Sequence, residues 1–143
     1  MRIQSLEQLQ MFAQKLADKI SPGDIVLLSG PLGVGKTTLT QLIAQCLGVT
    51  GAVTSPTYTY IHIHPFNTAE NVALLAHIDL YRVESPQDFH SIGILELVND
   101  PRVLSIIEWG EKFADLLPRH TLSIKITPKK DGAREIEAEP SLF

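Results

Sequence analysis

The sequence predicts an α/β fold in which a mostly parallel central sheet is flanked by helices and followed by a C-terminal antiparallel hairpin. Apolar runs of strand length alternate with stretches of helical periodicity, which is typical of a parallel sheet. Residues 30–37 (GPLGVGKT) have the pattern G-x-x-x-x-G-K-[ST] between an apolar run and a helical pattern. Residues 121–126 and 134–138 both suit strands, and the Asp131-Gly132 pair between them indicates the hairpin.

Length, charge and cysteine content limit the classes of function. The 143 residues fit a single domain, residues 1–143, with a proper core but no separate substrate domain. Twelve basic and sixteen acidic residues give a net charge of −4, and no basic stripe is present, which disfavours direct binding of nucleic acid. The single Cys46 cannot form an internal disulfide and fits a reducing compartment. Because no apolar run approaches the roughly twenty residues that cross a bilayer, and no hydrophobic leader is seen, we expect a cytoplasmic protein.

The first third of the chain predicts two helices around one buried strand. Residues 5–20 place apolar side chains at helical spacing after an S-L-E-Q capping box. Residues 24–29 have too few polar positions for a half-exposed strand, so they predict a central parallel one. Residues 36–47 predict the second helix, with Gly48 as its C-terminal cap.

The rest of the chain contains one alternating segment and several apolar ones. Residues 58–64 alternate so that His62 and His64 share a face with two tyrosines, which predicts a half-exposed strand with the histidines on its solvated side. Two histidines without a further soft ligand do not predict a zinc site. We expect a polar turn over 65–71, buried strands over 72–80 and 103–107, and short helices over 86–90, 94–98 and 111–117.

The glycine-rich segment predicts a cradle for phosphate. Without Cβ atoms, successive N–H groups can point into one concavity at a helix N-terminus. Lys36 is expected to reach the β- and γ-phosphates, the Thr37 hydroxyl to bind Mg²⁺, and Thr38 to donate to the α-phosphate. An ordinary glycine-rich turn is disfavoured, because a lysine at a helix N-terminus is unfavourable unless an anion is present. The predicted nucleotide contacts are Leu32, Gly33, Val34, Gly35, Lys36, Thr37 and Thr38.

Hydrolysis also needs partners for the metal and for the attacking water. Asp79 and Glu108 each follow an apolar run, so we expect both at the carboxyl ends of central strands, where ligands bind in open α/β sheets. The alternative for either residue is a solvated carboxylate in a loop. Thr57, in a Ser-Pro-Thr turn, is a candidate sensor of the γ-phosphate or its Mg²⁺. Trp109, beside Glu108, fits either the core or an interface.

Taken together, these motifs resemble those of the bacterial TsaE proteins, small P-loop ATPases needed to make N6-threonylcarbamoyladenosine in tRNA. The resemblance covers about residues 5–138. It rests on residues 30–38 (GPLGVGKTT), 54–58 (TSPTY), 77–82 (HIDLYR) and 107–111 (IEWGE), which occur in the family's order. It implies that Thr37 and Glu108 engage Mg²⁺, that Asp79 is a Walker-B-like acid, and that Thr57 lies near the γ-phosphate in a switch loop. Residues 65–71 have no clear place in the family pattern.

The resemblance also implies partners and base contacts. Trp109 is implied to lie close to the nucleotide, where partner binding can be felt, and Ser5 or Leu6 and Arg134 are implied to approach the adenine. The implied partners are the TsaD and TsaB proteins, whose assembly modifies adenosine 37 of tRNAs reading codons that begin with A. The chain would then meet tRNA only through that complex.

The leading prediction is a Mg²⁺-dependent ATPase that supports a partner complex, with Lys36, Thr57, Asp79 and Glu108 as its catalytic residues and ATP and Mg²⁺ as its cofactors. A small-molecule kinase is the alternative, although it needs an acceptor pocket and usually an arginine-bearing lid, and the five arginines are scattered. A GTP-dependent switch would need N-K-x-D and D-x-x-G motifs, which the sequence lacks. A binding module without turnover is the fourth class.

Overall fold

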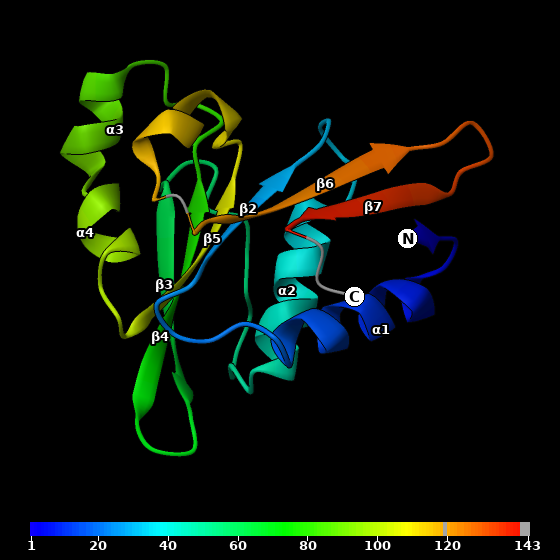
Figure 1. The fold of residues 1–143 in the computed structure, drawn as a ribbon, viewed down its shortest axis with the longest axis horizontal. Helices are drawn as coiled ribbons and strands as arrows, with labels where there is room; N and C mark the ends of the chain where they lie inside the picture. Colours follow the sequence, from blue (N-terminus) through cyan, green and yellow to red (C-terminus); the bar gives the residue numbers. More distant parts are fainter. Residues whose placement is uncertain (119, 141–143) are drawn as a thin grey trace.

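The computed structural model describes residues 1–118 and 120–140, which form one seven-stranded sheet with helices against both faces (Figure 1). The strands are β1 (Arg2–Ile3), β2 (Ile25–Ser29), β3 (Ile61–Asn67), β4 (Val72–Asp79), β5 (Val103–Glu108), β6 (Leu122–Pro128) and β7 (Arg134–Glu139). The helices are α1 (Leu6–Ala17), α2 (Lys36–Cys46), α3 (Pro86–Ile92), α4 (Ile94–Val98) and the 3-10 helix η1 (Glu111–Leu116). The predicted α/β class and the C-terminal hairpin β6–β7 are confirmed.

The sheet is parallel at its centre and antiparallel at its edges. Its strand order is β1-β7-β6-β2-β5-β4-β3, and the pairs β6–β2, β2–β5 and β5–β4 are parallel. The flanking pairs β1–β7, β7–β6 and β4–β3 are antiparallel, so the sheet as a whole is mixed. All six residues of β5 are buried, as expected for a central parallel strand covered on both faces.

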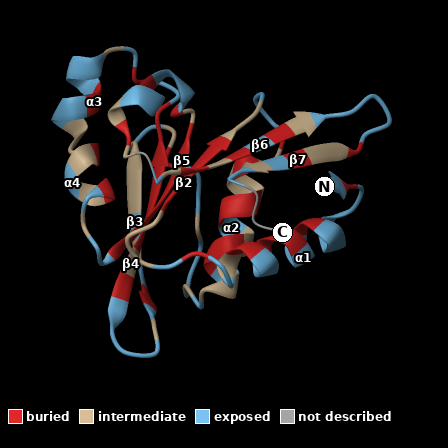
Figure 2. Cartoon of the chain, in the orientation of Figure 1, coloured by how far each residue is buried: buried red, intermediate tan, exposed pale blue. Residues whose placement is uncertain are grey.

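Two hydrophobic cores hold the helices against the sheet. The first joins α1 and α2 to one face, and the second joins α3, α4 and η1 to the other. Neighbouring residues of one strand serve opposite cores, as Ile106 and Ile107 of β5 do. Buried residues therefore concentrate in the central strands (Figure 2). Each large apolar side chain buried in this way contributes about 1.5–3 kcal/mol, which keeps the strand ends rigid.

The prediction for β3 is wrong at both ends. A turn precedes the strand, in which the N–H of Tyr60 donates to the Pro56 carbonyl at 2.7 Å, so pairing begins at Ile61 and not at residue 58. At the other end the strand continues through Phe66, which is buried, and the expected polar turn shrinks to residues 68–71. Pro65 is tolerated inside the strand because β3 is an edge strand.

The solvated side predicted for the β3 histidines is also wrong, although the other face is covered in part, because Ile61 packs against the second core. Phe66 packs into the first core, and His64, which shares its face, has a buried Nε2 atom. Ile63, on the other face, is 47% exposed. Alternation shows that a strand has two different faces, but it does not show which face the rest of the chain covers.

Helix boundaries follow the sequence closely. The N–H of Gln8 donates to Ser5 Oγ at 3.2 Å, as predicted for the cap, while the Gln8 side chain accepts from the N–H of Gln4. Gly48 follows α2 with φ of 85°. In the described parts, 1–118 and 120–140, no helix is long and apolar enough to span a membrane.

Candidate nucleotide site

The loop that joins β2 to α2 requires glycine at two positions. A Cβ at Gly30 would lie 2.6 Å from the carbonyl oxygen of Ile126, so β6 packs directly against the loop. Gly35 is the N-cap of α2 and has φ of 115°, a conformation that other residues rarely adopt. These two glycines let the backbone turn tightly and enter the helix.

The N-terminus of α2 is open to an anion. In the described structure its N-cap supplies no side-chain hydrogen bond, and its first turn carries no acidic residue. The first turn instead begins with Lys36. Because a helix N-terminus carries a partial positive charge, a lysine there is favourable only when an anion binds between them. This arrangement fits the phosphates of a nucleotide.

Lys36 is buried and faces three carboxylates. It is 4% exposed, its Nζ donates to the Gly30 carbonyl at 2.5 Å, and the same atom lies 3.4 Å from the centre of the Trp109 ring. Burial lowers the pKa of Lys36, and the charges of Glu111, Glu108 and Asp79 oppose that shift. A buried cation held by a carbonyl and an aromatic face is well placed to accept a stronger, anionic partner.

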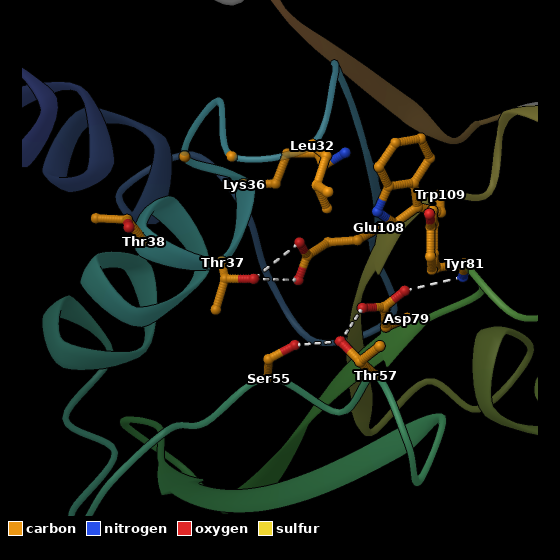
Figure 3. A pocket seen from close by; sticks show the side chains of 12 residues that line it. Leu32, Lys36, Thr37, Thr38, Ser55, Thr57, Asp79, Tyr81, Glu108 and Trp109 are labelled. Atoms are coloured by element: carbon orange, nitrogen blue, oxygen red, sulfur yellow. Dashed lines mark hydrogen bonds between the residues drawn. The ribbon is translucent and has the colours of Figure 1, made fainter.

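The two predicted carboxylates lie side by side. Asp79 ends β4 and Glu108 ends β5, and the two residues are register partners in the parallel pair. Both are buried, Glu108 to 2% exposure. The Thr37 hydroxyl donates to Glu108 Oε1 at 3.0 Å and approaches Oε2 at 3.2 Å (Figure 3). The structure therefore connects the phosphate loop to a carboxylate at the carboxyl edge of the sheet.

The Ser-Pro-Thr turn reaches the same edge. The Thr57 hydroxyl donates to Asp79 Oδ2 at 3.0 Å, and Ser55 Oγ lies 2.7 Å from Thr57 Oγ1 (Figure 3). The other Asp79 oxygen accepts from the N–H of Tyr81 at 2.9 Å. Asp79 thus holds the loop before β3 to the end of β4, which puts Thr57 in the same cavity as Lys36 and Thr37.

A cavity of about 250 Å³ joins these groups. Its lining consists of Leu32, Gly33, Gly35, Lys36, Thr37, Thr38, Ser55, Thr57, Asp79, Tyr81, Glu108 and Trp109. Ser55 and Tyr81 are not among the predicted site residues, although each lies within two residues of one. Val34, a predicted contact, is outside the cavity: its side chain is in the first core and its N–H donates to Pro31.

A second hollow of about 290 Å³ lies where the N- and C-terminal segments meet. Ser5, Leu6 and Arg134 line it together with Thr38, which also lines the first cavity. The pairing of β1 with β7 brings these distant segments together. A Cβ at Gly35 would lie 3.3 Å from the Arg134 guanidinium, so that side chain reaches the phosphate loop.

Trp109 stands between the core and the surface. It has φ of 61°, and its ring packs against Tyr81 with 5.0 Å between centroids. It is partly exposed and lines the first cavity. Leu32 and Tyr58, each 77% exposed, lie on the two loops that contribute to this cavity.

The family model described as "Threonylcarbamoyl adenosine biosynthesis protein TsaE" matches residues 3–136. The chain belongs to the TsaE family. The resemblance that the motifs indicated is thus confirmed over nearly the whole chain. The family takes part in the biosynthesis of threonylcarbamoyladenosine in tRNA.

Individual TsaE relatives agree with this assignment. A TsaE protein of Treponema pallidum is 38% identical over 117 residues, which is 82% of each chain. The TsaE protein of Bacillus subtilis is 36% identical over 130 residues, or 91% of this chain and 78% of that protein. The crystal structure of Bacillus subtilis YdiB superposes with a TM-score of 0.75 and 32% identity, covering 95% of this chain and 80% of that one. These relatives and the solved structure therefore support the family assignment and the fold over most of the chain.

Proposed function

We propose that the chain is a Mg²⁺-dependent ATPase that supports the TsaD–TsaB complex in forming N6-threonylcarbamoyladenosine at position 37 of tRNAs reading codons that begin with A. The observation that carries the ATPase proposal is the hydrogen bond between Thr37 and Glu108, beside the one between Thr57 and Asp79. The phosphate loop, the carboxylates that end β4 and β5, and the Ser-Pro-Thr loop meet at one edge of the sheet. Phosphoryl transfer needs such groups to position the phosphates, the metal and the attacking water.

ATP binding is assigned to the loop and the two hollows. The backbone N–H groups of Gly33 and of residues 35–38, together with the Lys36 ammonium, would hold the phosphates. The hollow lined by Ser5, Leu6 and Arg134 would take the adenine, since it adjoins the phosphate loop through Thr38. In this arrangement the nucleotide touches both terminal segments of the chain.

The residues present also fit Mg²⁺. Thr37, Glu108 and Asp79 offer hydroxyl and carboxylate oxygens, which are the donors that this hard cation prefers. The ion would neutralise charge on the β- and γ-phosphates. Asp79 would keep Thr57 directed at the γ-phosphate side of the cavity, where its hydroxyl can help to orient the attacking water.

The partner role is supported by the surface around the cavity. Leu32 lines the cavity and is exposed, and Tyr58 is exposed on the loop that carries Thr57; large exposed apolar side chains near a functional site favour protein contacts. Trp109 would sense such a contact, because its ring touches Lys36. The net charge of −4 favours contact with tRNA through partners.

Of the residues that line the cavity in the described structure, Lys36 alone is cationic, and none is an arginine. A small-molecule kinase usually closes an arginine over the phosphates. The observation therefore favours hydrolysis assisted by a partner over phosphorylation of a metabolite.

The test is reconstitution with purified TsaD, TsaB and a substrate tRNA. We expect ATP turnover to rise on mixing, with free phosphate as product, and tRNA modification to depend on this chain. The Glu108→Ala variant should join the complex without supporting modification. Absence of any rise in turnover or modification would refute the proposal, and phosphate appearing on a small metabolite would identify a kinase instead.

A further inference from the structure

We propose that His77 is a positioning residue that fixes the carboxylate of Glu108 for its magnesium role; this inference rests on the function proposed above. His77 is completely buried in β4, and its Nε2 lies 2.5 Å from Glu108 Oε2. Its register partner on β5 is Ile106, two residues before Glu108. Neighbouring parallel strands thus bring the imidazole beside the carboxylate from the sheet side.

Two side chains, from α2 and from β4, hydrogen-bond the Glu108 carboxylate. The Thr37 hydroxyl of α2 supplies one hydrogen, which Oε1 and Oε2 share at 3.0 and 3.2 Å. His77 Nε2–H supplies the other hydrogen, to Oε2 alone. The last torsion of a glutamate has a broad minimum, so a single shared hydroxyl does not fix the plane of the carboxylate. The imidazole removes that freedom.

The importance of His77 increases when the metal is bound. Thr37 is then expected to direct its oxygen at Mg²⁺, and its hydrogen bond to Glu108 need not persist. Among the described contacts of Glu108, His77 is the remaining protein donor. Side chains that hydrogen-bond a ligating carboxylate orient it, and their loss typically weakens metal binding 10- to 100-fold.

The second nitrogen of the His77 ring, Nδ1, is consistent with the same role. In the described structure its Nδ1 is buried without a hydrogen-bond partner, as is Nε2 of His64 on the same face of the sheet. His62 is the register partner of His77, which places His64 diagonally across the β3–β4 pair. The polar contact of His77 is therefore directed at Glu108 and not at the histidines of β3.

The test compares His77→Leu, His77→Gln and His64→Leu. Leucine removes the donor, whereas glutamine places an amide N–H close to the position of Nε2. Nucleotide affinity is measured for each purified protein by calorimetry with ATP, once in EDTA and once in Mg²⁺, together with its melting temperature. His64→Leu is the control, because it changes a partly buried histidine on the same face of the sheet that has no hydrogen bond to Glu108.

In EDTA, we expect His77→Leu to bind ATP with an affinity within about twofold of wild type. The factor by which Mg²⁺ increases the ATP affinity should be about tenfold smaller in His77→Leu than in wild type. His77→Gln should recover most of that increase, and His64→Leu should retain it. An unchanged magnesium effect in His77→Leu would overturn the role of His77. Equal losses in His77→Leu and His77→Gln, with lowered melting temperatures, would also overturn it. A wild-type protein without any magnesium effect would refute the proposed function itself.

Discussion

At the scale of single residues, Lys36 shows how a cation is held inside the cavity at the phosphate loop. Burial lowers its pKa, yet three nearby carboxylates favour the charged form, and the ammonium rests on the Gly30 carbonyl and the Trp109 ring. Neither contact neutralises the charge. A phosphate group would do so, which explains why a long cationic side chain is kept inside a cavity.

Replacement of Lys36 by alanine is expected to abolish measurable nucleotide binding, with a loss of at least about 100-fold in affinity, because charge-assisted contacts to the phosphates disappear. Calorimetric titration with ATP measures this. Lys125→Ala, at an exposed position on β6, is the matched control and should bind as wild type does. Wild-type affinity in Lys36→Ala would contradict the assignment of the phosphate loop.

At the scale of elements, the parallel pair β4–β5 determines which side chains can act together. Its register puts Asp79 and Glu108 opposite each other; the first turn of α2 brings Thr37 to Glu108, and the loop before β3 brings Thr57 to Asp79. The apolar runs predicted this edge, because strands buried on both faces must be central. The pairing of particular threonines with particular carboxylates was not predictable, since it depends on how the loops fold.

Alanine at Asp79 or at Glu108 should leave part of the nucleotide binding and reduce turnover by about 10²–10³-fold, because the transition state loses its charge-stabilising groups. Turnover is measured as phosphate release in the presence of the partners, and binding is measured in parallel. Glu96→Ala on α4 serves as the control at an exposed carboxylate. If either site variant keeps its turnover, the assignment of that carboxylate is wrong.

β3 supplies a prediction on pH. Burial lowers the pKa of His64, and the nearby His62 and His77 lower it further. The unfolded chain therefore binds a proton at this residue more readily than the folded chain does, so stability is lost as the pH falls below about 6.5. Replacing His64 by leucine should make the loss of stability between pH 7 and pH 5 smaller. Urea denaturation at several pH values measures the free energy of unfolding, and His90→Gln, at an exposed histidine, is the control. If the free energy of unfolding of His64→Leu changes with pH as that of wild type does, the expectation is wrong.

At the scale of the whole molecule, β1 pairs with β7 at one edge of the sheet, and this pairing brings residues 5 and 134 to one hollow. Long periodic segments, such as α1 and β5, could be predicted from the sequence because burial repeats along them. β1 could not, since two residues show no period. The side of β3 that turns toward the first core could not be predicted either, because it depends on where Phe66 packs.

The hollow at the terminal segments is distinct from the first cavity, so we expect Arg134 to affect binding of the base more than binding of the phosphates. Arg134→Ala should weaken the binding of ATP several-fold and the binding of inorganic tripolyphosphate to a smaller extent, because Arg134 lines the hollow assigned to adenine and its guanidinium also reaches the phosphate loop at Gly35. Competition titrations with both ligands measure the two effects. Arg102→Ala, an exposed arginine that pairs with Asp100, is the control. Equal losses for both ligands would place Arg134 at the phosphates.

The proline inside β3 lowers the tendency of the sheet edge to pair with other chains. An edge strand exposes backbone groups that another chain can pair with, and long flat edges therefore promote aggregation. Pro65 stands in the middle of this edge and offers no N–H, while the opposite edge, β1, is only two residues long. Neither border of the sheet is a good template for a foreign strand, so association of copies of this chain along the sheet edges is disfavoured.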